Sequence, residues 1–121
     1  MAQPRSFFKG RAQAYKLFVV IHKTIETLGP TTMEVGKTQI SFEVKRKFAW
    51  VWLPQMWIKS QPESSVVLSI GLRRKVVDRR IKESVNPYPG RFTHHIVITK
   101  AADVDASVKG WLKEAYDAAS T

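Results

Sequence analysis

The chain has 121 residues, of which 44% are hydrophobic and 11% aromatic, and it contains no cysteine. This length fits one domain, and the apolar content can build a core without a metal or a disulfide. The lack of cysteine excludes disulfides, thiolate metal sites and cysteine nucleophiles, and it fits a reducing cytoplasm. Twenty basic residues against ten acidic ones give a net charge of +10. Such an excess favours binding to a polyanion, nucleic acid included, unless it is only a solvated surface.

The N-terminal segment carries Arg5 and Lys9 and has no long apolar run, so we expect no signal peptide. The longest apolar runs, 17–21 and 48–53, are far shorter than the roughly 20 residues that a membrane span requires. We therefore expect a cytoplasmic protein with no membrane span. It forms a single domain over residues 1–121, with a core over about 7–118.

The first predicted element is a helix from Arg11 to Leu28, in which apolar residues recur every three or four positions. Gly29 and Pro30 follow and end it. The residues of the apolar face are Ala14, Leu17, Phe18, Ile21, Ile25 and Leu28. This spacing predicts that one face of the helix is buried.

Strand signals follow the helix, either as strict alternation or as short β-rich runs. The predicted strands are residues 32–35, 38–44, 48–53, 66–72 and 92–99. The short basic link Lys45-Arg46-Lys47 predicts a hairpin between the second and third of them.

The segment from Arg73 to Asn86 is highly charged, and Asp78 can cap a short helix there that runs through Val85. Residues 86–90, with two prolines, predict a rigid loop. Either Asp103 or Asp105 can cap a closing helix. The apolar face of that helix would be Val104, Val108, Leu112 and Ala115, with Trp111 beside it.

Together these elements predict an α+β fold. An antiparallel sheet of four to five strands is flanked by an N-terminal and a C-terminal helix, with a possible short helix before the last strand.

The strand 48–53 is apolar on both faces. Alternation places Phe48, Trp50 and Trp52 on one face, and Ala49, Val51 and Leu53 on the other. Either both faces are covered by core, or the aromatic face lines a ligand groove, since a tryptophan N–H suits a partly wet site.

The two adjacent histidines point to opposite faces of their strand, so they cannot ligate one metal together. His94 shares its face with Phe92, Ile96 and Ile98, and is either a structural histidine or a pocket residue. A pocket beside the aromatic strand would draw its tentative ligand-binding residues from Lys37, Gln39, Trp50, Trp52, Arg91, His94 and His95. No P-loop, GxGxxG or GxSxG pattern is present, so we assign no cofactor, no metal and no catalytic residue.

Basic residues cluster between and after the predicted strands. The residues predicted to bind a polyanion are Lys45, Arg46, Lys47, Arg73, Arg74, Lys75, Arg79 and Arg80. Basic loops beside aromatic side chains are typical of surfaces that bind single-stranded nucleic acid.

Several segments together resemble an uncharacterised bacterial family, a domain of unknown function. They are Phe8-Lys9-Gly10, Lys37 to Phe42, Phe48 to Pro54 with Trp57, Gly90 to His95, and Trp111 to Tyr116. The resemblance covers nearly the whole chain and implies a small α+β domain. It implies no activity, but its motifs surround the strands of Lys37, Trp50 and His94.

Three classes of function stay open. The first is a non-catalytic module that binds nucleic acid or a phosphorylated molecule through basic and aromatic surface. The second is an enzyme or accessory domain with a small pocket around Lys37, Trp50, Arg91 and His94. The third is a protein-interaction domain whose charge is incidental. The sequence does not fix an oligomeric state.

Overall fold

A computed structural model describes residues 4–53, 65–79, 81–88 and 91–121, with the backbone alone for 82–88 and 91. The helices are α1 (Pro4–Phe7), α2 (Ala12–Glu26), the short 3-10 helix η2 (Ala101–Asp103) and α3 (Ala106–Ala119). The strands are β1 (Thr32–Val35), β2 (Gln39–Glu43), β3 (Lys47–Trp52), β4 (Val66–Leu72), β5 (Ile81–Tyr88) and β6 (Arg91–Ile98).

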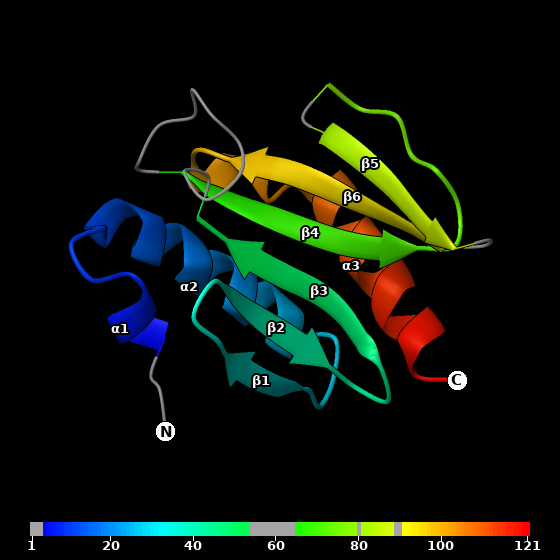
Figure 1. Ribbon diagram of the computed structural model, residues 1–121, viewed down its shortest axis with the longest axis horizontal. Helices are drawn as coiled ribbons and strands as arrows, with labels where there is room; N and C mark the ends of the chain where they lie inside the picture. The colour runs from blue at the N-terminus through cyan, green and yellow to red at the C-terminus, as the bar shows by residue number, and fades with distance from the viewer. Residues whose placement is uncertain (1–3, 54–64, 80, 89–90) are drawn as a thin grey trace.

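The six strands form one antiparallel sheet in the order β1-β2-β3-β4-β6-β5. Helices α2 and α3 lie on one face of this sheet, and α3 packs against β3 and β4 (Figure 1). The predicted α+β fold, with an antiparallel sheet flanked by an N-terminal and a C-terminal helix, is confirmed. Within the described residues, no helix is long and apolar enough to cross a bilayer.

Helix α2 buries the face that its sequence spacing predicts, since Ala14, Leu17, Phe18, Ile21 and Ile25 are all buried. It ends shortly before Gly29, whose φ of 143° is a conformation that side-chain-bearing residues avoid. Asp105 caps α3, because its side chain accepts a hydrogen bond of 3.1 Å from the Val108 backbone N–H.

The predicted short helix from Asp78 to Val85 is wrong, because most of that segment forms strand β5. Residues 86–88, assigned to a loop, belong to the same strand, and 89–90 lie outside the described residues. β5 is an edge strand that pairs only with β6, and an edge strand tolerates both Pro87 and frequent charges. Pairing with β6 therefore outweighed the local helical signal.

Phe48 does not share a face with Trp50 and Trp52. The register between β2 and β3 pairs Phe42 with Ala49 but Glu43 with Lys47, so Phe48 is an extra residue in a β-bulge. The bulge turns Phe48 into the core, where it is 1% exposed and meets Tyr116 of α3 edge to face. One face of β3 therefore packs in the hydrophobic core, and its two tryptophans lie on the opposite face.

Candidate functional site

The two adjacent histidines lie on opposite faces of β6. His94 faces the helices, is 1% exposed, and its Nε2 accepts a hydrogen bond of 2.9 Å from the Val76 N–H. Burial lowers the pKa of His94, so the ring is neutral at pH 7 with its proton on Nδ1. His95 lies on the other face, where its Nδ1 is 2.6 Å from Ser69 Oγ.

The face of the sheet opposite the helices gathers four of the seven residues predicted to bind a ligand. Register places Gln39 beside Trp52, and it aligns Ser41, Trp50, Ser69 and His95 in one row across β2, β3, β4 and β6. Both tryptophans and His95 are half-buried, whereas Ser41 and Ser69 are buried. We call these residues the tryptophan face.

The remaining three predicted residues do not join that row. Lys37 is exposed in the turn before β2, at the end of the sheet where Trp52 lies. Arg91 is the first residue of β6 and lies at the opposite end of the sheet, about 20 Å along the strand from the position that aligns with Trp52. Its side chain is outside the described residues. His94 faces the helices. The predicted pocket around Lys37, Trp50, Arg91 and His94 therefore draws on both faces and both ends of the sheet.

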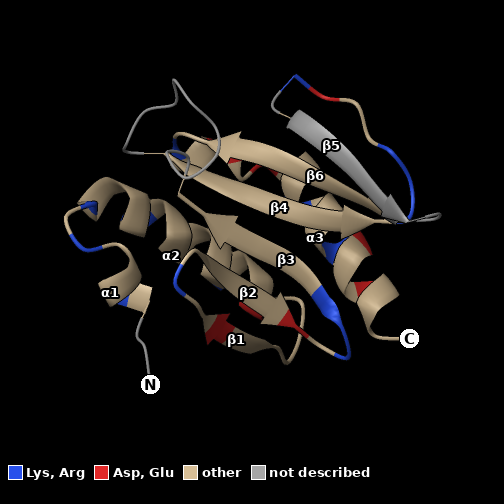
Figure 2. Cartoon of the chain, viewed as in Figure 1, with Lys and Arg blue, Asp and Glu red and all other residues tan. Residues whose placement is uncertain are grey.

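Two basic clusters that are distant in sequence lie at the same end of the sheet. The described pairing of β3 with β4 runs from Trp52 and Val67 to Ala49 and Ile70, so the start of β3 at Lys47 and the end of β4 at Leu72 are at one end. The turn 45–47 and the segment 73–75 are both at this end (Figure 2). We call it the basic end, and its residues are Lys45, Arg46, Lys47, Arg73, Arg74 and Lys75.

Three of the six side chains of the basic end make hydrogen bonds or ion pairs within the chain. Arg46 donates to the backbone oxygens of Ala118 and Thr121, at 3.1 and 3.2 Å. Arg74 makes two hydrogen bonds to the Glu114 carboxylate, at 3.0 and 2.9 Å, and this contact raises the pKa of Arg74.

Lys47 adds an ion pair with Glu34, with an N–O distance of 3.3 Å. Lys45, Arg73 and Lys75 are exposed. The two arginines that α3 fixes therefore stand among three exposed cations.

The third predicted cluster is separate from the basic end. Arg79 is exposed in the connection before β5, whose first residue pairs with Ile96 near the far end of β6. Arg80 lies outside the described residues.

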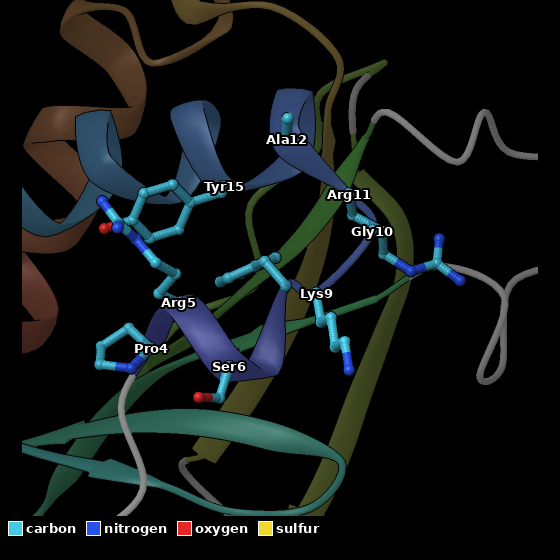
Figure 3. Close-up of a pocket in the computed structure, with 9 residues that line it drawn as sticks. Pro4, Arg5, Ser6, Lys9, Gly10, Arg11, Ala12 and Tyr15 are labelled. Carbon is cyan, nitrogen blue, oxygen red and sulfur yellow. The ribbon is translucent and has the colours of Figure 1, made fainter.

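The sequence did not point to an open groove of about 1060 Å³ at the N-terminal side of the molecule (Figure 3). Its lining residues are Pro4, Arg5, Ser6, Phe8, Lys9, Gly10, Arg11, Ala12 and Tyr15. We call it the N-terminal groove. A signal was present in the sequence, because the first acidic residue of the chain is Glu26 and the preceding segment holds five cations.

The architecture defines a small α+β domain with two helices on one face of an antiparallel sheet. The model of the family described as "Domain of unknown function (DUF5655)" matches residues 5–119, and the chain therefore belongs to this family. Searches of curated proteins and of solved structures gave no match.

Proposed function

We propose that this domain is a non-catalytic binding module for a polyanion, and that it holds the phosphates of a nucleic acid at the basic end. The observation that carries this proposal is the antiparallel pairing of β3 with β4, which places the two clusters at the same end of the sheet. Charges that repel one another at one place on a fold favour an anionic partner, which relieves the repulsion.

The arrangement combines fixed and adjustable donors. Arg46 and Arg74 are oriented by α3, so less conformational entropy is lost when a phosphate contacts their remaining N–H groups. Lys45, Arg73 and Lys75 are exposed and can follow the path of a flexible backbone. Glu114 and Glu34 offset only part of this charge.

Aromatic surface lies within reach of the same ligand. Strand geometry places Trp50 about 10 Å from Lys47, and Trp50 and Trp52 are only half-buried on the tryptophan face. Bases of a single strand stack on such rings with little dependence on sequence. This supports a single-stranded nucleic acid over a duplex.

The alternative of an enzyme with a pocket around Trp50 and His94 has less support, because these side chains lie on opposite faces of the sheet. The Ser69–His95 pair resembles part of a nucleophilic site, but Ser69 is 1% exposed. A nucleophile needs access to its substrate, so the pair fits a structural role better.

The test is binding of a fluorescein-labelled single-stranded oligonucleotide, followed by anisotropy over a series of salt concentrations. The variant Lys45→Gln/Arg73→Gln/Lys75→Gln removes the exposed cations of the basic end. The matched control, Lys16→Gln/Lys23→Gln/Lys109→Gln, removes the same charge from exposed positions on α2 and α3.

We expect the basic-end variant to bind more weakly. The slope of log K against log salt concentration should become shallower by about 2, since each phosphate contact on a single strand contributes about 0.7 to that slope. The control variant should keep the slope of the wild type. Equal weakening in both variants would mean that net charge alone drives binding. No binding by the wild-type protein at low salt would reject the proposal and favour the protein-interaction class.

A further inference from the structure

We propose that the N-terminal groove is a separate binding site for a small phosphomonoester that carries an aromatic or apolar body. The groove is formed by α1, the turn 8–11 and the first turn of α2. It lies at the other side of the molecule from the basic end (Figure 1). The inference is therefore independent of the nucleic-acid proposal.

The size of the groove fits a small molecule. Its volume of about 1060 Å³ is slightly above the range of about 300–1,000 Å³ that is typical of ligand pockets. The lining is mainly apolar, with a few polar groups, and this is the usual composition of such a site.

The floor of the groove is a rigid aromatic cluster. Phe8 is 3% exposed, and its ring centroid is 5.2 Å from that of Phe18 and 5.9 Å from that of Tyr15. Tyr15 is half-buried, and its ring carries the Arg5 guanidinium 5.7 Å from its centroid. An apolar ligand body would rest on this cluster without reordering it.

The turn that shapes the groove requires a glycine. Gly10 has φ of 77°, which L side chains rarely adopt. Apart from Gly10 and its two chain neighbours, no heavy atom of the described residues lies within 4 Å of the place where a Cβ would be. This conformation turns the chain from α1 into α2 and leaves open space beside the turn.

The charge of the lining selects an anion. Arg5, Lys9 and Arg11 all contribute to it, and none of its nine residues is acidic. Figure 3 shows Arg5 beside Tyr15, whereas Lys9 and Arg11 extend from the turn at Gly10, away from Arg5. A phosphomonoester suits such a set better than a single carboxylate, because it carries about 1.5 to 2 negative charges at pH 7 and three acceptor oxygens, whereas a carboxylate carries one charge and two oxygens.

The start of α2 adds to this preference. The side chain of the N-cap residue Arg11 does not cap α2, and the first turn of this helix carries no acidic residue. The positive end of the helix dipole is thus offset by no acidic side chain of that turn. Ser6, which also lines the groove, supplies a hydroxyl donor.

The experiment titrates the full chain with phenyl phosphate and follows its amide NMR signals. Inorganic phosphate and phenol, the two halves of this probe, are titrated separately for comparison. We expect saturable shifts centred on Gly10 and Ala12 with phenyl phosphate. Inorganic phosphate should bind about tenfold more weakly, since it lacks the apolar contact, and phenol should not saturate. If inorganic phosphate and phenyl phosphate bind equally well, the groove contacts only the anion and not the apolar body. That result would overturn the proposed ligand class.

The decisive variant is Ala12→Glu, with Ala12→Gln as its matched control. An acidic residue in the first turn stabilises a helix, so Ala12→Glu should fold at least as well as the control. It nevertheless places a negative charge at the groove, and we expect it to weaken phenyl phosphate binding by about tenfold relative to Ala12→Gln. Equal affinity of the two variants would overturn the proposal.

Two further variants locate the phosphate. Arg5→Gln and Lys9→Gln test the two sides of the groove. The variant on the side that holds the phosphate should weaken binding by about tenfold, whereas Lys23→Gln, at the other end of α2, should not. The basic-end variant of Lys45, Arg73 and Lys75 should bind phenyl phosphate as the wild type does. Shifts confined to that end would assign the anion site there and reject the N-terminal groove.

Discussion

Two neighbouring rows of residues cross the same four strands and have opposite character. One row faces the helices, and all of its members are 0% exposed. It consists of Ile40, Val51, Leu68 and Ile96. The other row faces away and consists of Ser41, Trp50, Ser69 and His95. Each residue of one row is adjacent in sequence to a residue of the other.

The two rows differ in the kind of interaction that their side chains contribute. The aliphatic row contributes burial of apolar surface, which is strong but has no direction. The row on the tryptophan face contains hydrogen-bonding groups, and a buried group of this kind requires a specific partner. The row on the helix face therefore contributes burial without direction, whereas the row on the tryptophan face contributes groups that require specific hydrogen-bond partners.

The largest effect expected from this contrast comes from two residues of one strand. Phe48→Ala should lower the free energy of unfolding by about 3–5 kcal/mol, because it leaves a cavity beneath α3. Trp50→Ala should cost less, since its ring is half-buried. Urea unfolding of both variants checks this order. A larger loss for Trp50→Ala would mean that the tryptophan face contributes as much to stability as the helix face.

A second prediction concerns His94, the histidine of β6 that faces the helices. His94→Leu removes the acceptor of the Val76 N–H and should cost about 1–3 kcal/mol at pH 7. His95→Gln on the tryptophan face should cost less. A larger cost for His95→Gln at that pH would reverse the assigned roles.

The same histidine gives a pH dependence. Burial lowers the pKa of His94 in the folded state, so below the ordinary value of 6.5 the unfolded chain takes up a proton that the folded chain refuses. The contribution of His94 to the free energy of unfolding should fall as the pH drops through 6.5 and level off below its folded-state pKa. The gap between wild type and His94→Leu should narrow over that range, whereas a constant gap would contradict this.

Hydrophobic periodicity correctly predicted helix α2 and the central strands of the sheet. The apolar spacing of α2 and the alternation of β2 are enough to fix their buried faces, and the link Lys45-Arg46-Lys47 correctly predicted a hairpin. Two features depended on contacts that no local pattern encodes. β5 is a strand because β6 lies beside it, and Phe48 is a core residue because the hairpin contains a bulge.

The candidate site was predictable to a similar degree. Strand alternation separated His94 from His95, which the structure confirms. It could not place Lys37 and Arg91 at opposite ends of the sheet, because the register between strands was unknown. The N-terminal groove depends on the angle between α1 and α2, which Gly10 sets through its backbone conformation.

The smallest predicted effect tests whether the polar row is held by a specific pair. Ser69→Ala removes the contact between Ser69 Oγ and His95 Nδ1, 2.6 Å apart, and should cost about 0.5–1.5 kcal/mol. A double-mutant cycle with His95→Ala isolates the pair, because it subtracts whatever else each residue contacts. A coupling energy near zero would mean that Ser69 and His95 are neighbours by register alone. Measurable coupling would show that the tryptophan face orients His95 through a buried hydroxyl, as no aliphatic residue at position 69 could.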